Sequence, residues 1–365
     1  NKNRKDAHMT TQNNSLDFKN QQFYIGLDVH KKRWVVTIRS NKMELKTFSM
    51  DPVAEQLNKY MEKNYPGGKY YSVYEAGFCG YGLHRELESY GFKNIIAAPT
   101  EIPTSNKEKN KKRDPVDSRK LSRERENDSL EGIYILNQLQ QELRSIVRQR
   151  LQLMKKQTRL KNQIKGYLHF YGHKLPENCE VRHWTKNFIE HLRKLDFNYS
   201  IGKEQLSIYL DELTEIRKLL VRIIKQIKNF VKEHNLQEEI TLLCSVPGVG
   251  FVVAITLLTE LIDPKRFPDL DNLASYVGLV PCILSSSEKE TKLGIKFHRN
   301  RFLREPLLEA AWVAVRKDPA LTYSYNNYIR RMSKQEAIIR IAKKLLSRIN
   351  YVWTNKKSYV NSVVK

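Results

Sequence analysis

The stretch Phe23-Tyr24-Ile25-Gly26-Leu27-Asp28 decides the fold of the N-terminal part of the chain. It is short, apolar and ends on a carboxylate, as expected of a buried central strand. The β-branched residues 34–38 predict a second strand, and residues 42–50 predict a third after a short turn. Apolar residues at helical spacing predict a helix over residues 51–64, which ends before Pro66.

The same alternation of strands and helices continues to about residue 98. Residues 70–74 predict a strand that leads into Glu75, residues 80–89 a helix, and residues 94–98 another strand. Three strands in a meander followed by helix, strand, helix and strand is the order of a ribonuclease-H-like fold. The sequence therefore predicts an α/β N-terminal domain.

Four carboxylates stand at the ends of these elements. Asp28 ends the first strand and Glu75 ends the fourth, and in the inferred sheet these strands are neighbours. The pair Asp114-Pro115 is typical of the start of a helix. Asp114 and Asp117 lie three residues apart and therefore share one face of that helix. Converging carboxylates are what metal-dependent phosphodiester chemistry needs. Taken singly, each is more often a solvated surface charge.

The chain is strongly basic, with 64 Lys and Arg against 40 Asp and Glu and a net charge of +24. Such a charge favours a nucleic-acid partner over an acidic membrane or protein, and over a basic protein with a merely solvated face. The excess is high over residues 107–125, where the candidate phosphate-binding residues are Lys111, Lys112, Arg113 and Arg119.

The four cysteines and the hydropathy suggest where the protein works. The cysteines are far apart and unpaired in spacing, which argues against a zinc site or a disulfide framework and is compatible with a reducing compartment. No apolar run is long enough to span a bilayer. We expect a cytoplasmic bacterial or archaeal protein with no membrane partner.

Two long helical patterns follow the N-terminal domain. Leu136, Leu139, Leu143 and Ile146 begin a heptad seam, which Arg150 and Gln157 interrupt. The second seam is more regular and contains Leu206, Tyr209, Leu213, Ile216, Leu220, Ile223, Ile227 and Phe230. A loop over residues 166–200 would join them. The pattern fits a coiled-coil arm and a pair of bundle helices equally well.

The C-terminal part begins with Ser245-Val246-Pro247-Gly248-Val249-Gly250. This pattern is typical of a helix-hairpin-helix, in which Gly248 and Gly250 would expose backbone N–H groups to a DNA phosphate. The alternative is a helix-to-helix turn that serves packing alone. Further helices are predicted over residues 302–316 and 334–353.

Six blocks of the chain, in the correct order, resemble the insertion-sequence 110 family of transposases. They are Ile25-Gly26-Leu27-Asp28-Val29-His30-Lys31, Tyr74-Glu75-Ala76-Gly77, Lys112 to Leu121, Val246-Pro247-Gly248-Val249-Gly250, Tyr276 to Pro281, and the stretch around Ala310-Ala311-Trp312. The resemblance runs from about residue 23 to 353, nearly the whole chain.

The resemblance implies a RuvC-like domain whose Asp-Glu-Asp-Asp tetrad is Asp28, Glu75, Asp114 and Asp117 and holds Mg2+. It also implies a coiled-coil connector and a C-terminal transposase domain carrying a nucleophilic serine that becomes covalently linked to DNA. The implied partners are donor and target DNA, a structured guide RNA and further copies of the chain, as a dimer or tetramer. We expect a disordered N-terminus over residues 1–21 and the RuvC-like domain over residues 22–128. The coiled-coil connector would span residues 129–238 and the C-terminal transposase domain residues 239–358.

The serine falls by this resemblance in the run Ser285-Ser286-Ser287. Spacing from Pro281 favours Ser286, with its two neighbours as alternatives, although the family commonly has Ser-Gly here. Without the resemblance, a polar loop in which no serine acts is the simpler interpretation, since a free hydroxyl is a weak nucleophile. Basic residues that would suit phosphate contacts follow, namely Lys292, Lys296, Arg299, Arg301 and Arg304.

The predicted function is therefore that of a transposase or recombinase. The alternatives are a metal-dependent nuclease or junction resolvase that ignores the serine, a DNA invertase, and a non-catalytic nucleic-acid-binding protein built on a decayed transposase.

Overall fold

The computed structural model describes residues 17–100, 102–103, 114–174, 184–286, 289–295 and 300–361, with backbone alone for residues 114–115, 281–286 and 289–295. The chain forms two compact units, Asn1–Leu136 and Asn137–Lys365. Most of the segment predicted to be disordered, residues 1–16, lies outside the described residues.

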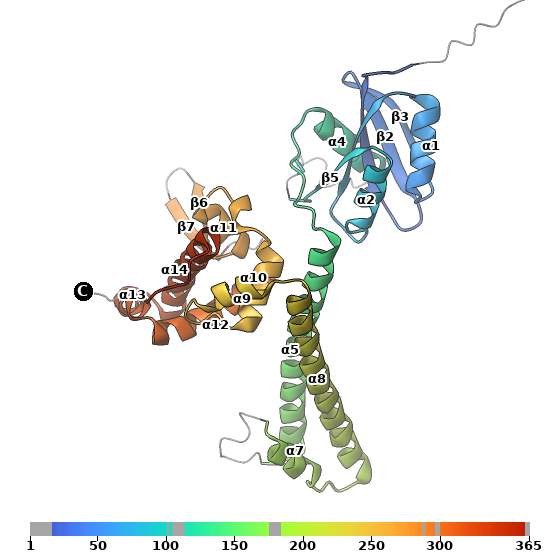
Figure 1. Cartoon of the computed structure of the whole chain (residues 1–365). Coiled ribbons are helices and arrows are strands. Elements are labelled where there is room, and N and C mark those ends of the chain that lie inside the picture. Colours follow the sequence, from blue (N-terminus) through green and yellow to red (C-terminus); the bar gives the residue numbers. More distant parts are fainter. Residues whose placement is uncertain are drawn as a thin grey trace, which may run out of the picture. The chain divides into compact units, whose positions relative to one another are not determined.

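The first unit is built on a five-stranded sheet (Figure 1). Its strands are β1 (Gln22–Val29), β2 (Trp34–Ser40), β3 (Met43–Met50), β4 (Lys69–Glu75) and β5 (Lys93–Ala97). The spatial order is β3-β2-β1-β4-β5; β1, β2 and β3 pair antiparallel, and β4 pairs parallel with both β1 and β5. This is the predicted mixed sheet of ribonuclease-H-like type.

Helices cover both faces of this sheet, because Phe23, Ile25 and Leu27 of β1 are buried on one face and Gly26 lies against α4 on the other. On one face, α1 (Ala54–Asn64) and α2 (Gly82–Ser89) pack with a buried core that includes Phe23, Ile25, Leu27, Leu57, Met61, Tyr74 and Leu87. On the other face lies α4 (Asp114–Glu126), where Leu121 packs with Val73, Ala97 and Leu130. Alternate residues of β1 therefore face different helices, as the period of a strand requires.

Gly26 lets α4 lie directly on the sheet. A Cβ placed at Gly26 would come within 2.1 Å of the Ser118 carbonyl oxygen and 2.5 Å of the Ser122 nitrogen, which are backbone atoms and cannot rotate away. One residue to the side, the buried hydroxyls of Thr37 and Ser118 are 2.9 Å apart and hold the helix to β2. The absence of a side chain at Gly26 thus determines how closely α4 approaches β1.

Gly26→Ala is expected to lower the free energy of unfolding by about 1–3 kcal/mol or more, because the new methyl group forces α4 away from the sheet. Gly82→Ala is the matched control, since a Cβ at Gly82 meets no atom within 4 Å and alanine suits its helical position. Urea unfolding of the two variants measures the difference. Equal stability of the two would contradict the close approach.

The second unit begins with two long helices, α5 (Gln138–Phe170) and α8 (Ser200–Glu233), which run side by side (Figure 1). The start of α5 packs with the end of α8, through Leu143, Val147, Ile227 and Val231, so the pair is antiparallel. The two predicted long helices are confirmed, although Leu136 precedes α5 and several predicted seam residues are only partly buried. The loop expected over residues 166–200 is wrong in part, because α5 continues to Phe170 and a short helix, α7 (Lys186–Arg193), packs its apolar face on the pair.

The rest of this unit is mostly helical, as predicted. It contains α9 (Gln237–Cys244), α10 (Phe251–Leu261), the short η1 (Pro264–Arg266), α11 (Leu270–Val277), α12 (Arg301–Lys317), α13 (Pro319–Ile329) and α14 (Lys334–Asn355), with a hairpin of β6 (Pro281–Ser286) and β7 (Lys289–Ile295). The helices expected over residues 302–316 and 334–353 are confirmed as α12 and α14. The sequence reading missed α11, α13 and the hairpin.

The long pair is anchored in this helical body at one end. Leu143 and Val147 of α5 belong to the same buried cluster as residues of α10, α12 and α14. Further along α5, Leu160, Ile164 and Leu168 pack instead in a separate cluster with α7 and α8. The pair therefore combines the two predicted alternatives: bundle helices near the body and a two-helix arm beyond it.

Candidate active site

Asp28 and Glu75 lie side by side at the ends of neighbouring strands. Leu27 of β1 is in register with Tyr74 of β4, and both candidates are the next residue along their parallel strands. Paired positions on adjacent strands are about 4.8 Å apart and point to the same side of the sheet. The predicted neighbourhood of the two strand ends is thus confirmed by the register.

Both carboxylates belong to the face that carries α4. Asp28 is two residues beyond Gly26, and Glu75 is two beyond Val73, which packs with Leu121 of α4. The Asp28 side chain is 17% exposed and its Oδ2 lies 3.2 Å from Nε2 of His30, while Glu75 is exposed. One of the two is therefore sheltered and oriented, and the other is open to solvent.

Helix α4 runs antiparallel to β1, so that its start lies toward Asp28. Near its end, Glu126 accepts a hydrogen bond of 2.8 Å from Nε of Arg39, which pairs with Tyr24 at the beginning of β1. Its middle lies over Gly26. From Gly26 to Asp28 the strand advances about 6.6 Å. Four residues back along the helix cover about 6 Å, which leads from Ser118 to the first turn.

That first turn contains the other two candidates. Asp114 is the first residue of α4, and Asp117 is half-buried beside Ser118, which contacts the sheet. Among the side chains that the structure describes, no three His, Cys, Asp or Glu form a metal-binding group; the side chain of Asp114 lies outside that set. The fold thus directs three chain segments to one edge of one face.

The donors gathered at this edge are oxygen atoms only, apart from His30. Hard divalent cations such as Mg2+ prefer carboxylate oxygens, and Mg2+ needs only one or two carboxylates together with water and phosphate oxygens. The residues present therefore fit a hard divalent cation better than zinc, whose sites are rich in Cys and His. His30 was not among the sequence candidates, and no spacing signal identifies its contact with Asp28.

The basic residues expected around the tetrad are only partly described. Lys111, Lys112 and Arg113 lie outside the described residues. Arg119 is exposed on α4, but its Nε lies 3.0 Å from Oε1 of Glu44 on β3. An exposed ion pair of this kind is weak, so Arg119 remains able to exchange Glu44 for a phosphate.

The glycine turn of the second unit joins α9 to α10. Gly248 has φ +89°, and a Cβ there would come within 2.2 Å of the Ala310 carbonyl oxygen on α12. Gly250 precedes α10, and nothing would lie within 4 Å of a Cβ at that position. Gly248 therefore has a packing role of its own, whereas Gly250 leaves the start of α10 open beside a pocket of about 620 Å³ that Lys317 also lines.

The serine candidates lie on the hairpin rather than in an irregular loop. Ser286 is the last residue of β6 and pairs with Lys289, and Ser285 pairs with Glu290. Ser287 lies outside the described residues. The expected polar loop is thus replaced, at Ser285 and Ser286, by strand backbone at the tip of a hairpin.

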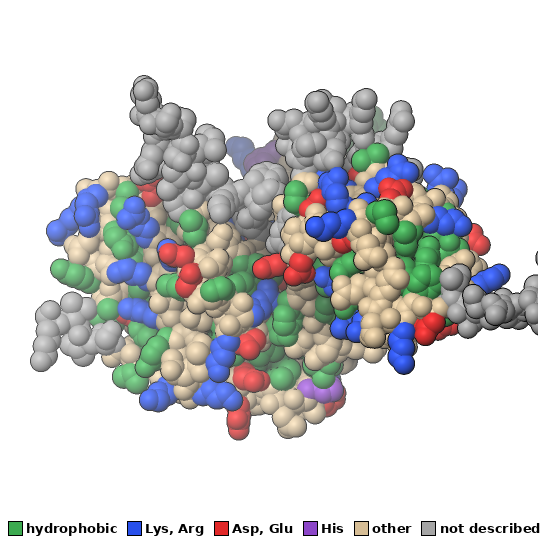
Figure 2. Space-filling model, turned by 90° about the horizontal axis from the view of Figure 1, so that it is seen from above, with side chains coloured by type: hydrophobic (Ala, Val, Ile, Leu, Met, Phe, Trp, Pro, Cys, Tyr) green, Lys and Arg blue, Asp and Glu red, His purple; other side chains and the backbone are tan. Residues whose placement is uncertain are grey.

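The remaining basic candidates flank this hairpin. Lys292 is on β7 opposite Ile283, and Arg301 and Arg304 are on the first turns of α12. Lys296 and Arg299 lie outside the described residues. On the face drawn in Figure 2, the Lys and Arg side chains of the described residues are spread among carboxylates rather than gathered in one patch. On this face, a polyanion would therefore meet local groups of cations and not one broad basic patch.

Comparison with known families finds two matches in this chain. The model for DEDD transposases of the IS110 type, described as "Transposase", matches residues 25–173. The model described as "Transposase IS116/IS110/IS902 family" matches residues 240–326. The first contains all four carboxylates of the predicted tetrad, and the second contains the glycine turn and the serine hairpin.

Individual relatives agree with these matches. The chain is 29% identical over 244 residues to the putative transposase y4qE of Sinorhizobium fredii. The aligned region covers 66% of this chain and 58% of that protein. The chain is 24% identical to the putative transposase y4rJ of the same species, over 88% and 89% of the two chains. It is also 29% identical to the transposase for insertion sequence element IS1533 of Leptospira borgpetersenii, over 80% and 85%.

Proposed function

The chain belongs to the IS110 family of transposases, enzymes that cleave and join DNA, and we propose that Asp28, Glu75, Asp114 and Asp117 form its metal-binding active site. The observation that supports this most is the convergence of β1, β4 and the start of α4 on one edge of one sheet face. The relatives are bacterial, and none of the described helices is long and apolar enough to cross a membrane. That the protein acts in the cytoplasm remains a proposal.

Two of the carboxylates have distinct tasks in this proposal. Asp28, sheltered and oriented by His30, is a ligand whose position the sheet determines. Glu75 faces solvent, where it would bind a divalent cation that still carries waters and can also take a phosphate oxygen. A bound divalent cation, which we propose is Mg2+, supplies Lewis-acid stabilisation of the phosphate and lowers the pKa of an attacking oxygen.

We further propose Ser286 as the nucleophile. Its Oγ would form an ester bond to phosphorus while the bond from phosphorus to a sugar oxygen breaks, and its proton would pass to that leaving oxygen. One phosphodiester replaces another, so the reverse step can rejoin DNA without a nucleotide cofactor. The position of Ser286 at a hairpin tip supports this, because a tip can reach a scissile phosphate more easily than a buried strand can.

The open start of α10 and the basic residues around the hairpin would bind the DNA backbone. Gly250 leaves backbone N–H groups accessible at a helix N-terminus, where an anion is favoured, and Lys317 lines the same pocket. Gly248 contributes through the turn that it makes possible. Lys111, Lys112, Arg113, Arg119, Lys292, Lys296, Arg299, Arg301 and Arg304 remain candidates for phosphate contacts.

The test is an assay for a covalent adduct between the protein and labelled DNA carrying an element junction, in Mg2+ and with the noncoding RNA of the element. Ser286→Ala is expected to remove both the adduct and cleavage, whereas Ser285→Ala and Ser287→Ala, as matched controls on either side, retain them. Undiminished cleavage by all three variants would instead support the alternative, a nuclease or resolvase that uses water.

Guide RNA, assembly and domain division are also part of the proposal. We propose that a structured RNA directs the enzyme to target and donor DNA, and that a dimer or tetramer forms. Omitting the RNA from the assay above is expected to abolish site-specific cleavage.

The divisions at residues 128 and 238 remain predictions, to be tested by whether residues 22–128 fold alone.

A further inference from the structure

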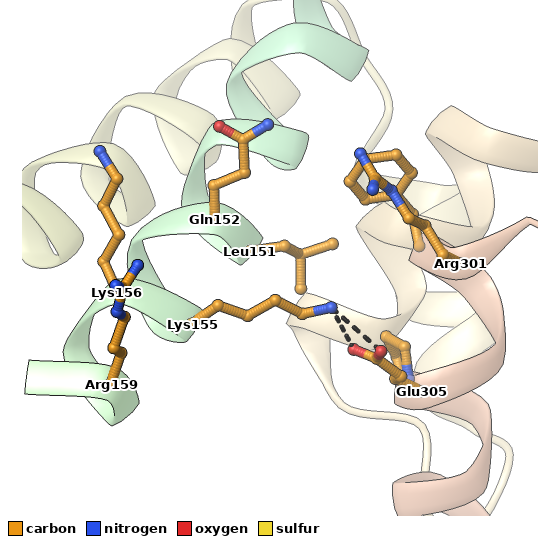
Figure 3. Close-up of a pocket in the computed structure, with 9 residues that line it drawn as sticks. Leu151, Gln152, Lys155, Lys156, Arg159, Arg301 and Glu305 are labelled. Atoms are coloured by element: carbon orange, nitrogen blue, oxygen red, sulfur yellow. Dashed lines mark hydrogen bonds and ion pairs between the residues drawn. The ribbon is translucent and has the colours of Figure 1, made fainter. Parts of the chain in front are cut away.

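A groove runs between α5 and the start of α12 (Figure 3). One part, about 390 Å³, is lined by Leu151, Gln152, Lys155, Lys156, Arg159, Arg301, Phe302, Glu305 and Pro306. The adjoining part, about 1080 Å³, shares several of these residues and extends along α5 to Gln163 and across to Val252 and Val253 of α10. The groove is thus large, and apolar side chains contribute to its lining.

Its charge is mainly positive. Five cations line it against two carboxylates, Glu305 and Glu309, which leaves an excess of three positive charges. Nζ of Lys155 lies 2.8 Å from Glu305, in the ion pair that crosses Figure 3. Lys156 and Arg159, on the α5 side, are exposed and have no carboxylate partner among the described residues.

The remaining two cations are held in place. The guanidinium of Arg301 lies 5.1 Å from the centre of the Phe302 ring, which limits where it can point. Nε of Arg150 is buried with no hydrogen-bond partner among the described residues, and burial lowers the pKa of this side chain. Arg150 also lines the wider part of the groove, where its guanidinium adds to the positive charge.

We propose that this groove binds the sugar–phosphate backbone of a single-stranded segment of nucleic acid. Lys156, Arg159 and Arg301 would contact phosphates, while Leu151, Met154 and Val253 would receive the apolar faces of sugars or unstacked bases. Basic grooves with apolar or aromatic lining are the usual arrangement for single strands. The groove also explains why Arg150 interrupts the apolar seam of α5, which faces the groove there.

This inference rests on the proposed function, because it supposes that DNA or RNA is the natural ligand. Binding is therefore measured with the full chain carrying Asp28→Asn, so that cleavage plays no part. The probes are a labelled single-stranded DNA, a single-stranded RNA and a duplex of the same sequence, each titrated at several salt concentrations.

The double variant Lys156→Gln, Arg159→Gln is expected to weaken single-strand binding about tenfold and to reduce the slope of log K against log salt by about 1.4, since each phosphate contact contributes roughly 0.7. The control removes the same charges from the other long helix, as Arg222→Gln, Lys225→Gln, both of which are exposed. It should leave affinity and slope nearly unchanged.

The outcomes are distinct. A larger loss for RNA than for DNA assigns the groove to an RNA strand, the reverse assigns it to DNA, and equal losses indicate recognition of the shared backbone. Losses no larger than in the control, or confined to the duplex, would overturn the proposal while the active site stands. If the wild-type chain neither binds nor cleaves nucleic acid, the proposed function itself fails.

Discussion

Asp28→Asn abolishes DNA cleavage, with an expected loss of about a thousandfold or more. Removing a group that only supports a metal ligand typically costs 10–100-fold, and Asp28 is proposed as a ligand itself. Asparagine keeps the shape and can still accept a hydrogen bond from His30, so the fold should persist. The measurement is the rate of strand cleavage in saturating Mg2+.

Two further readouts separate a metal-binding role from a structural one. Calorimetric titration should show that Asp28→Asn weakens the binding of Mg2+ to the chain, a result that does not depend on activity. Asp51→Asn, which removes an exposed carboxylate from the same unit, is the matched control and should behave as wild type. Full cleavage by Asp28→Asn would exclude the proposed metal site.

Glu260→Ala destabilises the second unit by about 3 kcal/mol. Its carboxylate is fully buried and accepts hydrogen bonds from Nε and Nη2 of Arg148, at 2.6 and 2.8 Å, while Nδ2 of Asn300 donates to it at 2.8 Å. Breaking a buried pair typically costs 3–5 kcal/mol. Because Arg148 is 36% exposed and can reach water, the lower end applies. Urea unfolding measures the loss.

The ion pair of Lys155 with Glu305, which joins α5 to α12, is a matched control for the ion pair of Arg148 with Glu260, which joins α5 to α10. It also ties α5 to the helical body, but both side chains are 60% exposed. Glu305→Ala should therefore cost less than about 1 kcal/mol. Similar losses for the two variants would mean that burial does not decide the strength of these contacts.

The contribution of Glu260 also depends on pH. Burial raises the pKa of its carboxyl, but hydrogen bonds from Arg148 and Asn300 and the charges of Arg148 and Arg144 outweigh burial and lower it below its ordinary value. A carboxyl whose pKa is lowered by folding stabilises the folded state at pH values above the pKa that it has in the unfolded chain. This stabilisation is lost as the pH falls through the pKa that it has in the folded state. The stability difference between wild type and Glu260→Ala should therefore narrow in acid.

The strands and the tetrad's surroundings were predictable because their signals are local. The apolar run of residues 23–28 is enough to predict a buried strand. The positions of Asp28 and Glu75 follow from the ends of their own strands, so no contact with a distant segment is needed to predict them. The role of Gly26 was not predictable, because its cause is the backbone of Ser118, which lies far along the chain. The same holds for the contact of Arg148 with Glu260.

The missed elements share a different cause. β6 and β7 pair as a hairpin although their serines, lysines and glutamates carry no strong alternation of apolar and polar side chains. Helices α7 and α11 have only eight residues each, so neither has the length that makes a helical period convincing. In each case pairing or packing with other segments overrides a weak local preference.

The two compact units differ in when their cores can close during synthesis. The first is complete once residue 136 has emerged, whereas the second joins Leu143 to Trp353 in one buried cluster. At about 5–20 residues per second, the interval between those two points is roughly 10–40 s. During that interval the apolar residues at the start of α5 remain exposed, because the helices that bury them have not yet been made. If synthesis stopped within α12, the incomplete chain would therefore contain a folded sheet with its carboxylates, joined to a second unit that cannot fold.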